Sequence, residues 1–533
     1  MKRILAIVLA AMMLFAVCAA CNKDSGGSNN GGGSGGGTNN ANAPANLDAG
    51  RDEVTIVLTG AAKQISPNYR LWNAERITAW NCYETLLVYH GAEPVPYLAE
   101  SWEYNADGTQ LTFHLRKDVK FSDGTPFVAE DVKASIENNK ESAYQSNYSD
   151  DIIDIQCPDD HTVVLTTGDE SGPKPNALVL YNMTWIYILP HEKLAKETNE
   201  WFKENLCGTG PYTIKNWDKT TGATVWEYRD DYWGVDYWGH EPYIKKITGY
   251  VYEDEYSRSI AIESGEVEFC RLYGESTYDT LVQAKGLKIE KVPTLVTYYL
   301  IFNTEKEPWN NKLVRQAASY ALNRQMILET TNKATGVASS CLANSMMVGY
   351  YNDVQMYDYN PEKAKELLKQ AGLQTPYDIT DGTFIYGENE LHVQVIAQNL
   401  ADIGINIQLD KRDTSTVETA QFNGDFSLSL SGQGSYGNDL GHLSQIFYSD
   451  KIGTGLNWAH YRNSEVDKMF LDYIQDVSDG RKEKAHKLLE YIQDESPYAL
   501  LFEQGEIFVY EEKLHCPMFT DGIYFFMNWY WTK

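Results

Sequence analysis

Residues 98–127 read LAESWEYNADGTQLTFHLRKDVKFSDGTPF and show the clearest local pattern in the chain. The run Asn105-Ala106-Asp107-Gly108 is typical of a tight turn, because Asn, Asp and Gly accept the backbone angles that turns require. After this turn, apolar Leu111, Phe113 and Leu115 alternate with polar residues. Successive side chains of a strand point to opposite faces, so this alternation predicts a half-buried β-strand.

Farther along, the chain alternates helices with strands. Asn360 can cap a helix, Pro361 suits its first position, and Gly372 suits its end. Residues 383–409 then predict a strand, a helix and a second strand, an order that implies a parallel pair joined by a right-handed crossover. The predicted fold class is therefore α/β. At 533 residues the chain is too long for a single core.

The beginning of the chain predicts export. Residues 1–20 carry Lys2 and Arg3 before an apolar run, as a signal peptide does. The run Cys18-Ala19-Ala20-Cys21 resembles a bacterial lipobox, which would place a lipid on Cys21; an ordinary signal peptidase site is the alternative. Residues 21–50 are rich in Gly, Ser and Asn and predict a flexible tether. We therefore expect an exported protein that is anchored to the outer face of the cell membrane by a lipid on Cys21.

Charge and motifs exclude several classes of function. A formal net charge of −29 repels phosphate backbones, so we expect no nucleic-acid partner. The sequence holds no His-Glu-x-x-His, Gly-x-Ser-x-Gly or P-loop motif, and we predict no catalytic residues, metal or cofactor. Six cysteines follow Cys21 without a Cys-x-x-Cys pair. Disulfides and buried free thiols remain equal alternatives for them.

The glycines of residues 432–437, GQGSYG, match the Gly-x-Gly-x-x-Gly pattern of dinucleotide sites. Such a site needs a helix to open at that point, whereas residues 438–441 continue as a loop. Glycine lacks a Cβ atom, which lets the backbone approach a ligand closely. We therefore interpret this segment as a ligand-contacting loop.

Several sequence blocks, in order along residues 52–510, resemble the family 5 extracellular solute-binding proteins, the oligopeptide-, dipeptide- and nickel-binding group of ABC importers. The blocks are LAESWE (98–103), LTFHLR (111–116), VKFSDGTPF (119–127), GTGPY (208–212), YWG (232–234), ESGEV (263–267), FNT (302–304), VRQA (314–317), NPEKA (360–364) and NSEVD (463–467).

The resemblance implies a two-lobe periplasmic-binding-protein-like fold (type II, large), with an extra subdomain inserted in the first lobe. A ligand would be enclosed at the interface of the lobes by hinge closure. The implied limits are residues 51–296 and 505–533 for lobe I, about 90–204 for the inserted subdomain, and 297–504 for lobe II.

The resemblance also implies ligand contacts. In peptide-binding relatives, the loop after the Gly-rich strand supplies an Asp that pairs with the α-amine of the peptide. Tyr436 stands in that position here, which leaves Asp439 as an acid that could substitute. A buried ammonium without a partner costs several kcal/mol, so a bound peptide needs one. The implied ligand-binding residues are Trp72, Asn73, Tyr298, Tyr299, Gln433, Gly434, Ser435, Tyr436 and Asp439.

The predicted function is capture of di- or oligopeptides and their delivery to the permease subunits of an ABC importer, by a monomer. The same fold could instead bind an oligosaccharide or a nickel chelate. From other classes, a secreted hydrolase would need a nucleophile and base that the sequence does not show. An adhesin or a signalling sensor on this fold stays open.

Overall fold

The computed structural model divides into residues Met1–Ala43 and Pro44–Lys533, and the fold described below is that of the second part. The described residues are 43–533 without 70, 72–73, 90–92, 198, 273–275, 332, 340, 355–356, 388–389, 435–436 and 519–522. Cys21, the predicted signal peptide and most of the predicted tether lie outside them. No helix in the described part of the chain is long and apolar enough to cross a membrane.

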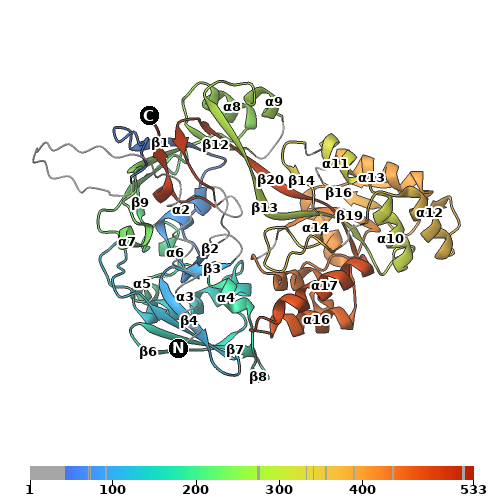
Figure 1. The fold of residues 1–533 in the computed structure, drawn as a ribbon, viewed down its shortest axis with the longest axis horizontal. Helices are drawn as coiled ribbons and strands as arrows, with labels where there is room; N and C mark the ends of the chain where they lie inside the picture. Colours follow the sequence, from blue (N-terminus) through green and yellow to red (C-terminus); the bar gives the residue numbers. More distant parts are fainter. Residues whose placement is uncertain are drawn as a thin grey trace, which may run out of the picture. The chain divides into compact units, whose positions relative to one another are not determined.

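One large sheet links the two lobes of the fold. Its strand order is β18-β16-β19-β13-β20-β12-β1-β11-β10-β9, and β14 pairs with β20. The long strands β13 and β20 run through both lobes: they pair with each other along most of their length, β20 also pairs with β12 of the first lobe, and β13 also pairs with β19 of the second (Figure 1). The strands are β1 (Glu53–Leu58), β9 (Tyr212–Trp217), β10 (Thr224–Tyr228), β11 (Lys246–Val251), β12 (Phe269–Leu272), β13 (Leu287–Phe302), β14 (Gly336–Val337), β16 (Phe384–Tyr386), β18 (Leu409–Lys411), β19 (Leu428–Gly434) and β20 (Tyr498–Glu511).

The first lobe carries a separate five-stranded sheet, with order β4-β5-β7-β6 and β8 on β7. It holds the predicted strand: Leu111, Phe113 and Leu115 lie in β5 with at most 1% exposure, which confirms the alternation. Gly108 in the preceding turn has φ +70°, in the region that favours glycine. The strands are β4 (Ala99–Tyr104), β5 (Gln110–Leu115), β6 (Ile152–Asp159), β7 (Thr162–Asp169) and β8 (Gly172–Pro173), beside the short pairs β2 (Leu87–Tyr89) with β3 (Pro94–Pro96) and β21 (Leu514–His515) with β22 (Tyr530–Trp531).

Helices cover both lobes. Those of the first lobe are α2 (Ala74–Cys82), α3 (Ala129–Lys140), α4 (Leu178–Asn182), α5 (His191–Lys196), α6 (Asn199–Phe202), α7 (Val235–Trp238), α8 (Glu255–Glu263) and α9 (Tyr278–Leu281). Those of the second are α10 (Lys312–Ala321), α11 (Arg324–Thr331), α12 (Pro361–Gln370), α13 (Glu390–Asp402), α14 (Thr414–Asn423), α15 (Ser444–Phe447), α16 (Ser464–Ile474) and α17 (Arg481–Glu495).

Two predictions for the second lobe can be checked directly. Asn360 caps α12 by accepting a hydrogen bond from the backbone N–H of Lys363 at 2.9 Å, as predicted. The predicted parallel pair is also confirmed, since β16 and β18 pair in parallel. The strand expected near 405–409 is split, however, because residues 405–406 (β17, Ile405–Asn406) pair instead with β15 (Tyr377–Asp378).

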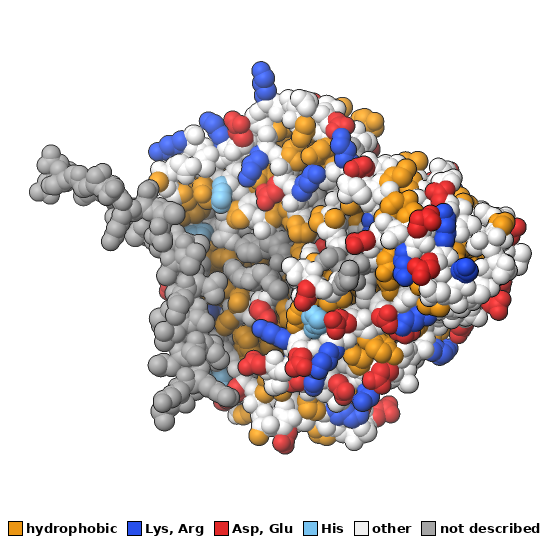
Figure 2. Space-filling model, turned by 45° about the vertical axis from the view of Figure 1, so that its right-hand side comes forward, with side chains coloured by type: hydrophobic (Ala, Val, Ile, Leu, Met, Phe, Trp, Pro, Cys, Tyr) orange, Lys and Arg blue, Asp and Glu red, His pale blue; other side chains and the backbone are white. Residues whose placement is uncertain are grey.

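Each lobe has its own core. The first-lobe core includes the fully buried Trp226, Trp529 and Trp531, and Nε1 of Trp531 donates to the carbonyl of Glu53 at 2.9 Å. This bond ties the end of the chain to the first strand. The described cysteines are free thiols, and all but the half-buried Cys157 are buried. On the face drawn in Figure 2, acidic and basic side chains are interspersed. One ion pair of the second lobe joins Lys312 to Glu495 at 3.0 Å.

Candidate functional site

The two crossing strands change register where they pass from one lobe to the other. Pairing of β13 with β20 is continuous from Leu287 to Pro293 and resumes at Thr297. The hydroxyl of Thr294, inside this gap, donates to the carbonyl of Gln504 at 2.8 Å. A second irregularity follows between Tyr298 and Tyr299. Interruptions of this kind are places where backbone angles can change without breaking the cores.

Away from the crossing strands, the lobes touch a second time through α4. The backbone N–H of Ala177 donates to the carbonyl of Ile474 at 2.8 Å, and Leu178 packs into a core cluster of the second lobe. Nε2 of His442 lies 2.9 Å from Oδ1 of Asn182. Burial lowers the pKa of His442, which favours the neutral form of the ring. The cleft is thus shut at this edge.

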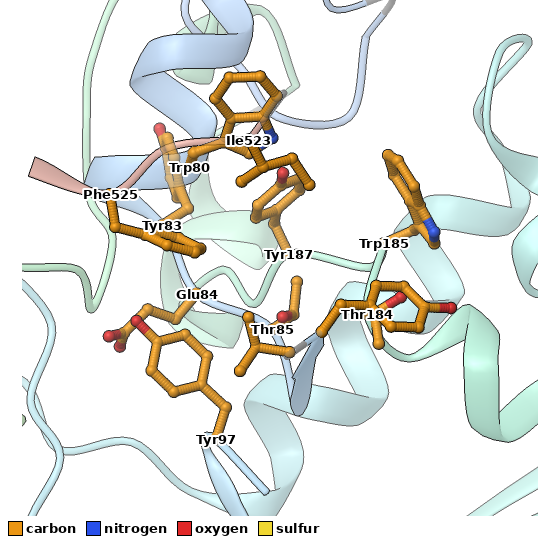
Figure 3. A pocket seen from close by; sticks show the side chains of 12 residues that line it. Trp80, Tyr83, Glu84, Thr85, Tyr97, Thr184, Trp185, Tyr187, Ile523 and Phe525 are labelled. Carbon is orange, nitrogen blue, oxygen red and sulfur yellow. The ribbon is translucent and has the colours of Figure 1, made fainter. Parts of the chain in front are cut away.

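An aromatic cavity lies in the first lobe beside this contact, with a volume of about 40 Å³ (Figure 3). The side chains that form its walls come from α2, from the segments around residues 83–97 and 184–187, and from the tail before β22. They are Trp80, Tyr83, Glu84, Thr85, Val88, Tyr89, Tyr97, Thr184, Trp185, Tyr187, Ile523 and Phe525. Apart from Glu84, none of these side chains carries a charge.

Glu84 is the acid of this cavity, and its carboxylate is almost fully buried, with 1% exposure. It accepts hydrogen bonds from the hydroxyl of Tyr232 at 2.7 Å and from Nε1 of Trp233 at 2.8 Å. Burial raises the pKa of Glu84, while these bonds and one from Tyr97 lower it in part. These donors are neutral, so they solvate the charge of an ionised Glu84 with dipoles but do not cancel it.

Trp185 lies at the opposite end of the cavity. Figure 3 shows Glu84 and Tyr97 at one end and Trp185 at the other. Nε1 of Trp185 is buried and has no hydrogen-bond partner among the residues that the structure describes. The indole ring stacks on Tyr148, with centroids 5.9 Å apart and planes 4° apart, which holds it in place. A buried donor without a partner costs free energy that an acceptor on a ligand would recover.

The two predicted ligand contacts on β13, Tyr298 and Tyr299, lie on opposite faces of that strand. Tyr299 is 2% exposed, and its hydroxyl donates to the carbonyl of Leu342 at 2.7 Å. It therefore fills the core. Tyr298 points to the other side of β13 and is half-buried, stacked on Phe502 with centroids 4.9 Å apart. A Cβ atom at Gly432 would lie 2.8 Å from this ring, so the glycine is required for their close packing.

The predicted Gly-rich loop is only partly described. Gln433 is buried, and its Nε2 donates to the carbonyl of Leu456 at 3.3 Å. Gly434 is exposed at the end of β19, where it pairs with Val296. The remaining predicted contacts, Trp72, Asn73, Ser435 and Tyr436, lie outside the described residues.

Asp439 has a structural role rather than the expected free carboxylate. Its two oxygens accept from Nη1 and Nη2 of Arg481 at 2.6 and 2.7 Å, and Tyr473 donates to it at 3.2 Å. The backbone N–H of Gly441 adds a bond at 2.8 Å. Asp439 is fully buried, and its charge is cancelled by the guanidinium. In this arrangement it has no capacity left for the ammonium of a ligand.

Sequence reasoning missed the cavity residues. Trp80, Tyr83 and Glu84 fall in and just after α2, and Tyr187 follows α4, about a hundred residues later. No spacing rule connects these segments. The one signal available was Glu84 inside the apolar and aromatic run 82–89, CYETLLVY, where a charged residue must find buried partners.

Comparisons with known proteins agree with this architecture. The family model for bacterial extracellular solute-binding proteins, family 5 (middle part), matches residues 93–454. The probable D,D-dipeptide-binding periplasmic protein DdpA of Escherichia coli (strain K12) is 24% identical over 477 residues, covering 85% of this chain and 89% of that protein. The nickel-binding periplasmic protein of the same strain is 29% identical over 408 residues, covering 71% and 75%.

Among solved structures, that of HbpA2 from Haemophilus parasuis superposes with a TM-score of 0.80 at 21% identity, covering 90% of this chain and 100% of that one. This likeness confirms the predicted two-lobe α/β fold. The family is one of substrate-binding proteins and not of enzymes, which removes the hydrolase alternative. The chain belongs to the family 5 bacterial extracellular solute-binding proteins, as the order of its sequence blocks predicted.

Proposed function

We propose that this protein captures di- or oligopeptides between its two lobes and hands them unaltered to the permease subunits of an ABC importer. The observation that carries the proposal is an aromatic cavity bordered by the buried carboxylate of Glu84, in a member of a solute-binding family. Peptides carry an ammonium group that complements this carboxylate. The D,D-dipeptide relative supports the same class of ligand.

The way in which the lobes meet supports a closing mechanism. We propose residues 51–296 and 505–533 as lobe I, with the insertion near 90–204, and residues 297–504 as lobe II. The interrupted pairing between Pro293 and Thr297 supports the first of these limits. Closure would exclude water from the cavity, and opening at the permease would release the peptide.

We further propose that the protein acts as a monomer, held at the outer face of the cell membrane by a lipid on Cys21. A flexible tether formed by residues 21–50 would let the two-lobe body reach the permease and turn toward it. Metabolic labelling with a radioactive fatty acid, compared between the wild type and Cys21→Ser, tests the anchor. Equal labelling of both proteins would contradict it.

Isothermal titration against a panel of di- to pentapeptides, with X-ray scattering on the same samples, tests peptide capture. We expect binding by some members, a smaller radius of gyration with peptide, and intact peptide recovered after prolonged incubation. Failure of every peptide to bind would overturn the proposal.

The nickel-binding relative favours a second candidate, a nickel chelate as cargo. Within the described residues there is no group of three or more His, Cys, Asp and Glu side chains that could hold a bare metal ion. A chelate brings its own ligands and needs none from the protein. Titration with a nickel–histidine chelate and with maltotriose, beside the peptide panel, separates these cargoes.

A further inference from the structure

Within the proposed function, the cavity raises a question of charge. Glu84 forms no ion pair with a described cation. Two cations lie near the walls of the cavity. The guanidinium of Arg116 lies 4.8 Å from the ring centre of Trp233 and donates to the carbonyl of Tyr97 at 2.6 Å, and that of Arg76 lies 5.3 Å from the ring centre of Trp80. Neither side chain lines the cavity. A buried carboxylate whose described donors are neutral creates a strong local preference for a cation.

The walls suit the same kind of group. Trp80, Tyr83, Tyr97 and Tyr187 are each at most 6% exposed and line the space that Glu84 borders (Figure 3). The face of an aromatic ring attracts a cation, most strongly where water is excluded. Rings alone would accept apolar groups equally well. A carboxylate beside them changes the preference toward an ammonium, because an apolar group would leave the charge unpaired.

Size limits the choice further. One water occupies about 10–15 Å³ of cavity volume, so a cavity of about 40 Å³ holds about three waters. That space fits an ammonium group with the carbon that bears it. It is too small for a sugar ring or a large side chain.

The loop expected to bind the peptide amine gives an independent reason. Its position for the amine-pairing acid holds Tyr436. The substitute acid, Asp439, is taken up by Arg481. A peptide enclosed here would need another acid for its ammonium.

We propose that the aromatic cavity of the first lobe binds the ammonium group of the ligand, with Glu84 as its counter-charge. The identity of the natural ligand, a peptide, rests on the proposed function. It requires only that an ammonium group enter the cavity, so it can be tested apart from that function.

The test uses the full chain as wild type, as Glu84→Gln and as Asp131→Asn. Asp131 is a matched control, since it is also a buried acid of the first lobe, but it holds the backbone N–H of His191 at 2.8 Å and does not line the cavity. Each protein is titrated with the tightest-binding peptide of the panel and with its N-acetyl derivative. Each protein is also titrated with ethylammonium chloride, and binding is followed by tryptophan fluorescence. Sodium chloride at equal ionic strength is the control.

We expect the wild type to prefer the free amine over the acetylated peptide by roughly 10- to 100-fold, as for a hydrogen bond to a charged group. Glu84→Gln should lose this preference, and Asp131→Asn should keep it. The ratio is internal to each protein, so partial destabilisation does not hide it. If Glu84→Gln does not fold, the acetylation ratio and the ethylammonium titration of the wild type decide whether the ammonium site exists.

The outcomes separate the two proposals. Peptide binding with no effect of acetylation in the wild type would overturn the ammonium site and leave peptide capture standing. If no peptide binds, the site is still supported when ethylammonium causes a saturable fluorescence change in the wild type and none in Glu84→Gln. Absence of that change in the wild type overturns it.

Discussion

Each lobe holds a buried carboxylate, and the surroundings of the two are opposite. Asp439 in the second lobe is bound by both guanidinium nitrogens of Arg481, so that its charge is cancelled in place. Glu84 in the first lobe has neutral donors, among them Tyr232, Trp233 and Tyr97, and no ion pair with a cation of the described residues. The difference teaches that burial alone does not mark a binding acid. What matters is whether the fold already supplies the opposite charge.

The largest expected effect is on stability, at Asp439. Asp439→Asn should lower the free energy of unfolding by about 3–5 kcal/mol, because it leaves the guanidinium of Arg481 buried without its partner. Urea unfolding measures this. The double variant Asp439→Asn with Arg481→Met should recover much of the loss, since no charge then stays unpaired. An unchanged unfolding midpoint together with lost ligand binding would show that Asp439 contacts ligand after all.

The stability change at Glu84 should depend on pH. Its folded pKa is raised by burial, so the folded protein holds this proton to higher pH than the unfolded chain does. The contribution of Glu84 is therefore complete at low pH and is lost as pH rises through the folded pKa. A difference of one between the folded and unfolded pKa of Glu84 corresponds to about 1.4 kcal/mol in the free energy of unfolding.

The measurement compares wild type with Glu84→Gln in urea from about pH 4 to pH 8, near and above the ordinary range for a Glu carboxyl. Burial raises the pKa of Tyr97 and of Tyr232 well above the ordinary value of a tyrosine, so both hydroxyls stay protonated over this range in both proteins. The wild type should lose stability relative to the variant as pH rises. A difference that stays constant with pH would show that the carboxylate is as well solvated as in water.

The smallest expected effect concerns closure itself. His442→Ala removes the side-chain hydrogen bond to Asn182 that joins the lobes. A neutral hydrogen bond contributes about 1 kcal/mol, so the equilibrium between closed and open forms should shift roughly fivefold toward open. Scattering without ligand measures the shift. His486→Ala is the control, because that ring contacts Asp353 within the second lobe; an equal change in both variants would exclude a specific role for the α4 contact.

Local elements of the fold could be predicted because their causes are local. The strand of Leu111, Phe113 and Leu115 follows from alternation over five residues, and α12 follows from Asn360 and Pro361 at its start. The split of the strand near residues 405–409 could not be predicted, since it depends on pairing with β15, some thirty residues earlier. A pattern of apolar residues gives a strand its faces but does not choose its neighbour.

By itself, the sequence determined the class of fold, the family and the absence of an acid at position 436. Only the tertiary structure decided between the two candidate acids, because their partners are distant in the chain. Arg481 is 42 residues from Asp439, and Tyr232 is 148 residues from Glu84. The charge that a buried carboxylate experiences depends on groups within a few ångströms of it, and the fold alone brings those groups together.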